Sequence, residues 1–488
     1  MSLNPRTPVL VGAAAVQQRE EDPRRADDAF ALMVRALAAA GEDAGVPALL
    51  ARADAIRAPR GFWRYGDPCR ALAERFGATA RTQVAEIGVL QTTLFGRAAA
   101  DIAVGDADVV LLCGAEAKFR SLRAQIAGIE IDDEAIGGEA DEVLRPADEI
   151  MSPLEIAHGL GRPVTQYAMI DNAMRAADGQ TIAAHRDEVA ALWAGMAAVA
   201  AKNPDAWNRT GPDAAAIRGA ASGNRMLAFP YTKLHNSQWN VDQAAGLILC
   251  SLETARAMGV SQDRCVFPLS VADNNHMVPL SQRPELHRSA GFRHAGRAAF
   301  RAAGVAPDDV AHRELYSCFP SAVRIQQREL GIDPELPATV TGGMTFAGGP
   351  LNNFVLQALA KMVERLRADT GRVGMVNAVS GLLTKQGVSL WASRPPDRPF
   401  AHTDVSEDTA RDMPAVPVHP EASGPARIAT YTVIYDGDEA SGSTFVLDLE
   451  GGGRTVASSD DAALAQRLVE EEGCGRVVSL EKGTLLPG

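Results

Sequence analysis

Apolar runs of strand length alternate with helical stretches through most of the chain. Thr7–Gly12 and Asp108–Gly114 are predicted to be buried strands, because each is a nearly continuous apolar run that ends in glycine. Asp27–Ala40, Pro68–Phe76 and Leu90–Val104 are predicted to be helices. The alternation predicts an α/β fold with a mostly parallel sheet.

The same order of elements recurs in the second half of the chain. Met33–Ile56 and Gly296–Ser317 both read as a helix, a glycine, an acidic turn and a short strand. This match predicts an internal duplication of two similar halves, residues 1–255 and 256–393.

Three segments lie outside this repeat. The pattern loosens over about 118–235, which we expect to be an inserted helical lobe. Arg394–Pro425 is rich in proline among acidic and small residues, which predicts a linker. Residues 426–488 alternate short apolar runs with Gly and Asp turns, which predicts a small all-β domain, a five-stranded barrel of OB type.

The loop Thr339–Phe354 (TVTGGMTFAGGPLNNF) has no ionisable side chain and contains two glycine pairs. We expect it to lie between a strand and the helix Asn353–Arg367. Glycine lets backbone N–H groups approach a ligand, and a helix N-terminus favours negative charge nearby. The alternative is a tight strand-to-helix turn that binds nothing.

Charge and composition exclude several classes of protein. The formal net charge of -13 argues against a nucleic-acid partner, because phosphate binding needs a basic face. No apolar run approaches the roughly 20 residues of a membrane span, and the N-terminus lacks a signal-peptide pattern, so we expect a cytoplasmic protein. The scattered cysteines and histidines show no ligand spacing, so we expect no structural metal.

Four motifs together resemble the thiolase fold, in which two similar halves stack as αβαβα layers. They are DIAVGDADVVLLCGAEA (Asp101–Ala117), DQAAG (Asp242–Gly246), ELYSCF (Glu314–Phe319) and the glycine-rich loop Gly342–Pro350. More narrowly, YSCFPSAV, PYTK, GGPLNN and the extra C-terminal β-domain resemble bacterial thiolase-like proteins usually labelled acetyl-CoA acetyltransferase. The resemblance implies an acyl-CoA thioester as substrate and no bound cofactor, and it leaves a homodimer open.

The chain departs from the thiolase pattern at its catalytic positions. The acyl-accepting Cys falls on Gly88, and the catalytic His falls on Gly349. The second Cys falls near Ala378 or Val379, and the Asn of the NEAF motif falls on Tyr316. Without a thiolate and a paired base, a standard two-cysteine thiolase is excluded.

The resemblance still leaves candidate catalytic residues. Backbone N–H groups of Gly348, Gly349, Ser380 and Gly381 are candidates for stabilising an enolate or thioester oxyanion. Tyr316 is a candidate for proton transfer, and the alternative is a buried phenol bonded to backbone. Cys318 could carry an acyl group if a cation lowered its pKa, and the alternative is a small buried core residue.

Four further residues are candidates for binding. Tyr231 and Lys233 of PYTK could hold CoA through adenine stacking and phosphate pairing, although a solvated lysine is the ordinary interpretation. His235 and His276 are possible site residues, although each could be an ordinary loop histidine.

Three functions are therefore open. The first is an acyltransferase with altered catalytic residues, and the second is a retro-aldol lyase that acts on a β-hydroxyacyl-CoA. The third is a non-catalytic acyl-CoA binding protein.

Overall fold

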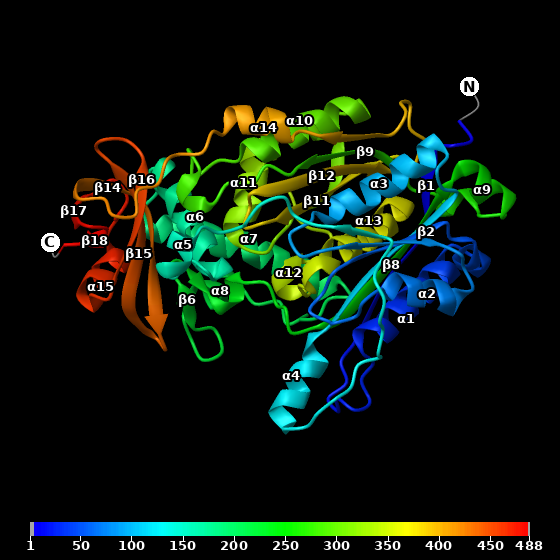
Figure 1. Cartoon of the computed structure of the whole chain (residues 1–488), viewed down its shortest axis with the longest axis horizontal. Coiled ribbons are helices and arrows are strands. Elements are labelled where there is room, and N and C mark those ends of the chain that lie inside the picture. Colours follow the sequence, from blue (N-terminus) through cyan, green and yellow to red (C-terminus); the bar gives the residue numbers. More distant parts are fainter. Residues whose placement is uncertain (1–3, 487–488) are drawn as a thin grey trace.

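Two mixed β-sheets form the body of the molecule, and the computed structural model describes residues 4–486 (Figure 1). The first sheet has the order β1 (Pro8–Gln18), β8 (Asp242–Ser251), β4 (Val109–Ala117), β2 (Ala55–Pro59), β3 (Arg81–Ala85) and β5 (Glu142–Leu144). The second has the order β10 (Val310–Glu314), β11 (Val373–Ser380), β12 (Lys385–Ala392), β9 (Phe267–Asn274) and β13 (Ala401–Asp404).

The predicted duplication is visible in the strand order. β1-β8-β4-β2 of the first sheet corresponds to β9-β12-β11-β10 of the second. In both sets the three successive pairings are antiparallel, antiparallel and parallel. The prediction of a mostly parallel sheet holds only in part, because both sheets are mixed: β8 and β12 run antiparallel to their neighbours, and the pairings of β2 with β4 and β3 and of β3 with β5 are parallel.

Two central helices separate the sheets and contact both of them. These are α3 (Gln91–Val104) and α13 (Phe354–Ala368), one from each half. The outer faces are covered by α1 (Ala29–Asp43), α2 (Pro68–Phe76) and α10 (Ala290–Ala303), and α11 (Pro320–Leu330) packs on α10 and on helices of residues 118–235. The layers are therefore αβαβα, and the N-termini of the two central helices lie deep in the molecule.

Residues 118–235, predicted to be an inserted helical lobe, contain helices that are joined by long irregular segments and short strands. The elements of this lobe are α4 (Lys118–Ala127), α5 (Pro153–Ala157), α6 (Pro163–Ala177), α7 (Ile182–Lys202), α8 (Ala214–Arg218), β6 (Met226–Ala228) and β7 (Tyr231–Thr232). The acidic stretch Asp132–Glu142 runs along the surface and ends in β5, which pairs with β3. No helix within residues 4–486 is long and apolar enough to cross a membrane.

The C-terminal domain is a β-rich unit that packs on the lobe (left in Figure 1). Its strand order is β16 (Arg454–Ser459), β15 (Glu439–Leu449), β14 (Gly424–Asp436), β17 (Val477–Glu481) and β18 (Thr484–Leu485). Strand β6 of the lobe joins this sheet by pairing with β14. The prediction of an all-β unit missed the helix α15 (Ala462–Glu470), and within residues 4–486 no strand ladder closes β16 onto β18.

The segment predicted as a linker is partly ordered on the body. Ala401–Asp404 forms β13, which adds to the second sheet beside β9, and Ser406–Asp412 forms α14. His402 of β13 donates a hydrogen bond from its ring Nε2 to Asp273 Oδ2 over 2.9 Å. Arg394–Pro425 therefore fastens the C-terminal domain to the body over part of its length.

Candidate functional site

Four loops meet at the N-termini of α3 and α13, and we call them the loop cluster: residues 86–91, 316–319, 347–353 and 380–384. Gln91 Nε2 donates to Asn352 Oδ1 over 2.9 Å, which joins the starts of the two helices. The segment 237–238 joins two more loops, because Ser237 N donates to Cys318 O and Gly349 N donates to Gln238 O. The duplicated fold therefore brings the predicted catalytic loops to one place.

A buried carboxylate anchors the glycine-rich loop. Glu314 accepts hydrogen bonds from the Thr339 and Thr341 hydroxyls and from the backbone N–H groups of Val340 and Thr341. Burial raises the pKa of Glu314 to about 7, although these donors oppose the shift. Contrary to prediction, the element directly before the loop is the helix α11 and not a strand. The single turn α12 (Gly343–Phe346) lies within the loop, and α13 follows it as predicted.

Close packing explains the second glycine pair. Gly348 has a φ of 105°, and a Cβ there would lie 2.2 Å from Gln243 Oε1, so only glycine fits. The N–H of Gly349, predicted to face an oxyanion, is already donated to Gln238 O over 2.8 Å. A ligand would have to displace that carbonyl to use the Gly349 N–H.

Backbone strain is concentrated in two of these loops. Leu351, Leu382 and Leu383 have φ values of 42°, 56° and 66°, and they are three of the four non-glycine residues with positive φ within residues 4–486. Such residues cost about 1–3 kcal/mol each and cluster at functional sites. Arg283 Nη2 donates to Leu382 O over 2.7 Å and so holds the loop that follows Ser380 and Gly381.

Tyr316 presents a phenol that is not bonded to the protein. Both its backbone groups are bonded to the Gln326 side chain, and its ring meets Phe354 edge-on at 6.0 Å. The side chain is half-buried, and its hydroxyl has no hydrogen-bond partner among residues 4–486. Burial raises the pKa of Tyr316, so the phenol is neutral at physiological pH.

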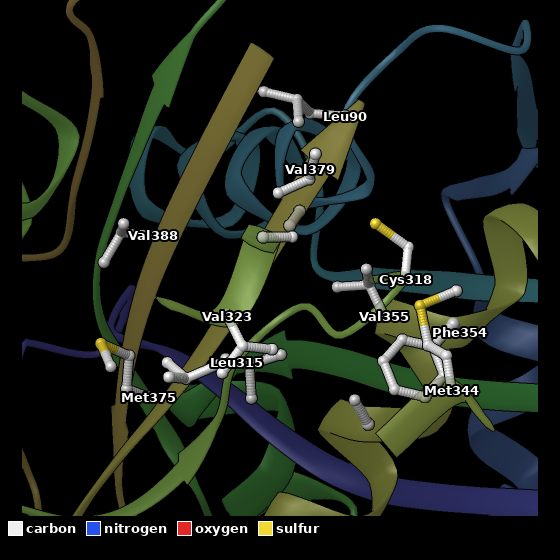
Figure 2. Packing of buried hydrophobic residues seen from close by; sticks show 14 of the residues in the cluster. Leu90, Leu315, Cys318, Val323, Met344, Phe354, Val355, Met375, Val379 and Val388 are labelled. Atoms are coloured by element: carbon white, nitrogen blue, oxygen red, sulfur yellow. The ribbon is translucent and has the colours of Figure 1, made fainter. Parts of the chain in front are cut away.

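Cys318 lies in the apolar core instead of facing a cation. Only 8% of it is exposed, and Figure 2 shows it within the cluster that includes Val355, Phe354 and Met344. Burial raises the pKa of its thiol to about 12. The thiol is therefore protonated at neutral pH, which favours the core interpretation over a nucleophile.

Gly88, onto which the acyl-accepting cysteine of thiolases falls, is covered by neighbouring side chains. A Cβ on Gly88 would lie 3.1 Å from Pro146 Cγ and 3.8 Å from Ile150 Cδ1. Lys385 Nζ donates to Gly88 O over 2.8 Å, and Lys385 is only 3% exposed. The sequence did not suggest Lys385 as a site residue, because its neighbour is 297 positions away in the chain.

The four predicted binding residues do not form one binding site, although two of them touch the loop cluster. The Tyr231 and Phe319 rings are stacked with centroids 6.0 Å apart, and Thr384 Oγ1 donates to His276 O over 3.3 Å. Tyr231 is fully buried, its hydroxyl donates to Asp171 over 2.7 Å, and its ring has no free face for adenine. Lys233 is exposed. His235 is buried as part of a local turn with Thr232, and burial lowers its pKa to about 3. The His276 ring lies against Met413 O.

An exposed aromatic pair borders the loop cluster and was not predicted. Phe62 and Trp239 are 43% and 52% exposed, and their rings meet edge-on at 5.7 Å. Lys118 Nζ lies 4.7 Å from the Phe62 ring centroid and 5.5 Å from that of Trp239. Trp239 directly follows Gln238, so these groups stand at the margin of the loop that holds Gly349.

Comparison with known proteins agrees with this fold. Residues 406–483 match the family described as the thiolase-like protein type 1 additional C-terminal domain. The crystal structure of a monomeric SCP2-thiolase-like protein type 1 from Mycobacterium smegmatis is similar over 100% of both chains, with a TM-score of 0.83 and 26% identity. An Ltp2–ChsH2(DUF35) aldolase shares the fold over 81% of this chain and 100% of its own, with a TM-score of 0.62 and 20% identity.

A sequence relative is the acetyl-CoA acetyltransferase of Methanothermobacter thermautotrophicus, 26% identical over 180 residues. The match covers 32% of this chain and 46% of that protein, so the chain spans about half of the relative's length. The duplicated sheets, the converging loops and the matched C-terminal domain lead to one assignment. The chain belongs to the thiolase superfamily, among the SCP2-thiolase-like type 1 proteins that carry an additional C-terminal domain.

Proposed function

We propose that the loop cluster binds an acyl-CoA thioester and that Tyr316 exchanges a proton with it, as a retro-aldol or aldol reaction requires. The observation that carries this proposal is the neutral Tyr316 hydroxyl, which has no protein partner within residues 4–486 and lies beside the start of α13. A positioned phenol can protonate the enolate that cleavage of a β-hydroxyacyl-CoA leaves, or the alkoxide that condensation forms.

The helix N-termini supply the second element of this chemistry. The starts of α3 and α13 favour negative charge, which is what a thioester enolate carries. Gly348, Ser380 and Gly381 remain the candidate N–H donors, and the strained loop around Leu382 keeps that backbone in place. Through Tyr316 and these N–H groups, the protein contributes a proton and electrostatic stabilisation.

Acyl transfer through Cys318 is the competing function that the family relationship favours. The surroundings of Cys318 are unfavourable for acyl transfer. Burial raises the pKa of its thiol and keeps it protonated, and no cation within residues 4–486 lowers that pKa. Passive binding of an acyl-CoA is the other competitor, and the apolar packing around Cys318 favours it.

The aromatic pair at the margin suits the CoA part of the ligand better than Tyr231 does. Phe62 and Trp239 are exposed, and Lys118 adds a positive charge. Adenine can stack on an exposed indole, and a lysine can pair with phosphate. We place the nucleotide end of the ligand here.

One set of measurements separates the three functions. Calorimetry with acetyl-CoA and a longer acyl-CoA tests binding, and intact mass after incubation tests acylation in wild type and Cys318→Ala. An acyl adduct that the mutation abolishes would establish acyl transfer instead. Binding without an adduct, together with turnover of a β-hydroxyacyl-CoA, supports the proposal, whereas binding without turnover means a passive binder.

We also propose that the chain acts as a monomer. β3 would be an open sheet edge in the body, but β5 pairs with it at Gln83, Val84 and Ala85. A covered edge cannot add a strand from a second copy. The similar Mycobacterium smegmatis protein is described as monomeric.

A further inference from the structure

Lys385 stands out among the basic residues of this chain. Only six of the 48 basic residues are lysines, and two of those six, Lys361 and Lys385, are buried. Lys361 pairs with Asp205 at 3.2 Å and Glu364 at 2.7 Å. Lys385 forms no ion pair within residues 4–486, and its Nζ is bonded only to the carbonyl of Gly88.

At a buried position without an ion-pair partner, lysine and arginine differ in how easily they lose a proton. A guanidinium stays charged in proteins, whereas a buried ammonium gives up its proton far more easily. Burial lowers the pKa of Lys385, although Asp273 and Asp404 oppose the shift. A chain that otherwise prefers arginine therefore keeps an ionisable amine bonded to Gly88, the residue onto which the acyl-accepting cysteine of thiolases falls.

The surroundings of the amine belong to the loop cluster. Lys385 is directly opposite Ser380 in the β11–β12 ladder, so the two side chains share one face of the sheet. Pro146 and Ile150 cover Gly88, and Ile150 also lies 3.8 Å from a Cβ placed on Gly381. These two residues come from the segment 145–150, which contains no helix or strand and is mostly exposed. For a ligand to reach the amine, this segment has to move aside.

We propose that Lys385 is a nucleophilic amine that captures the keto group of a 3-oxoacyl thioester as a Schiff base. The neutral Nζ attacks the keto carbon, and a proton passes from nitrogen to the former carbonyl oxygen to give a carbinolamine. Loss of water then forms the C=N bond, with no oxidant or reductant. The proposal rests on the proposed function for the CoA part of the ligand, and it adds both a catalytic residue and a substrate class.

Reductive trapping tests this directly. The full-length protein is incubated with acetoacetyl-CoA and sodium cyanoborohydride, and the adduct is located by peptide mass analysis. We expect one reduced adduct on the peptide that holds Lys385, absent without the reductant. It should be lost in Lys385→Arg, which keeps the charge, and in Lys385→Met, and should persist in the exposed control Lys202→Met.

Two further arms separate failure of this proposal from failure of the proposed function. Acetyl-CoA has no keto group, so it should bind by calorimetry yet give no adduct, and an amide on Lys385 without reductant would overturn the Schiff base. Acetyl-CoA binding with no trapped adduct overturns the role of Lys385 alone. If no CoA thioester binds, 2,4-pentanedione tests the amine without CoA, and absence of its adduct on Lys385 overturns the proposal as well.

Discussion

Two regions of this molecule differ in whether their buried polar side chains have partners within the protein. At the seam, which we define as Asn172 and Arg175 of α6 with Tyr431 and Glu472 of the C-terminal domain, each is paired. Arg175 is fully buried and donates to Glu472 Oε1 over 2.8 Å and to the Tyr431 hydroxyl over 3.0 Å. The Tyr316 hydroxyl of the loop cluster and Lys385 Nζ, which is bonded to Gly88 O of the loop cluster, have no charged or side-chain partner within residues 4–486.

We interpret the paired groups of the seam as structural and the unpaired groups at the loop cluster as functional. Asn172 Nδ2 donates to Phe229 O over 3.1 Å and to Tyr431 O over 2.8 Å, so the seam satisfies its polar groups with protein atoms and fixes two domains together. An unpaired buried group costs free energy unless something else pairs with it. We infer that a ligand completes the loop cluster, whereas the seam is complete by itself.

The largest stability effect is expected from breaking the seam. Arg175→Met removes the partner of Glu472 and of the Tyr431 hydroxyl, and we expect it to lower the free energy of unfolding by about 3 kcal/mol. Chemical denaturation measures this change. The matched control is Arg476→Met, because Arg476 pairs with Glu471 on the surface of the same domain and should cost about 1 kcal/mol or less. Equal losses from the two changes would contradict the account of the seam.

The stability contributions of two buried carboxylates, Glu472 of the seam and Glu314 beside the loop cluster, should change in opposite directions as the pH rises. Although burial opposes it, Arg175 holds the pKa of Glu472 below its usual value, whereas burial raises that of Glu314 to about 7. The contribution of Glu472 is present above its unfolded pKa and is lost as pH falls through the folded value. That of Glu314 is present below pH 4.5, its ordinary pKa, and is lost as pH rises through about 7.

Glu314→Gln isolates the second of these contributions. Between pH 5 and 8, wild type should lose about 2 kcal/mol of stability that the variant does not lose. Urea denaturation at several pH values measures the difference between the two proteins. The exposed control Glu450→Gln should leave the wild-type slope unchanged, and a slope that survives in Glu314→Gln would assign it to other groups.

The smallest stability effect is expected from a change in β5, at the edge of the first sheet. There the measured quantity is self-association of the protein. Val143→Pro disrupts β5, which pairs with Val84 and its neighbours, and should expose the edge of β3. We expect self-association by size-exclusion chromatography with light scattering. Ala135→Pro, in an exposed part of the same surface stretch, should stay like wild type. A monomeric Val143→Pro protein would show that β5 is not what protects the edge.

Local signals explain which elements could be predicted. α2 was predicted with its observed bounds, because Asp67 caps it, Pro68 begins it and Gly77 ends it with a φ of 72°. β3 was missed because RTQVA is short and polar, and its burial comes from neighbouring strands. The order along the chain of the loops predicted to be catalytic was read from their motifs.

The location of the candidate site could be predicted better than the side-chain contacts within it. The contact of Lys385 with Gly88 and the hydrogen bond from Tyr231 to Asp171 join residues far apart in sequence, so no local pattern announces them. The aromatic pair Phe62 and Trp239 comes from two segments for the same reason. Tyr316 was identified because it occupies a motif position, and the structure adds that its hydroxyl is unpaired within residues 4–486.

The central claim is that the loop cluster does proton chemistry on an acyl-CoA through Tyr316, and one comparison tests it most directly. Cleavage of a β-hydroxyacyl-CoA is followed for wild type, Tyr316→Phe and Cys318→Ala, with thioester binding measured in each. We expect Tyr316→Phe to bind normally and to lose about 100-fold in turnover, while Cys318→Ala keeps its activity. Full activity in Tyr316→Phe, or its loss only in Cys318→Ala, would contradict the account.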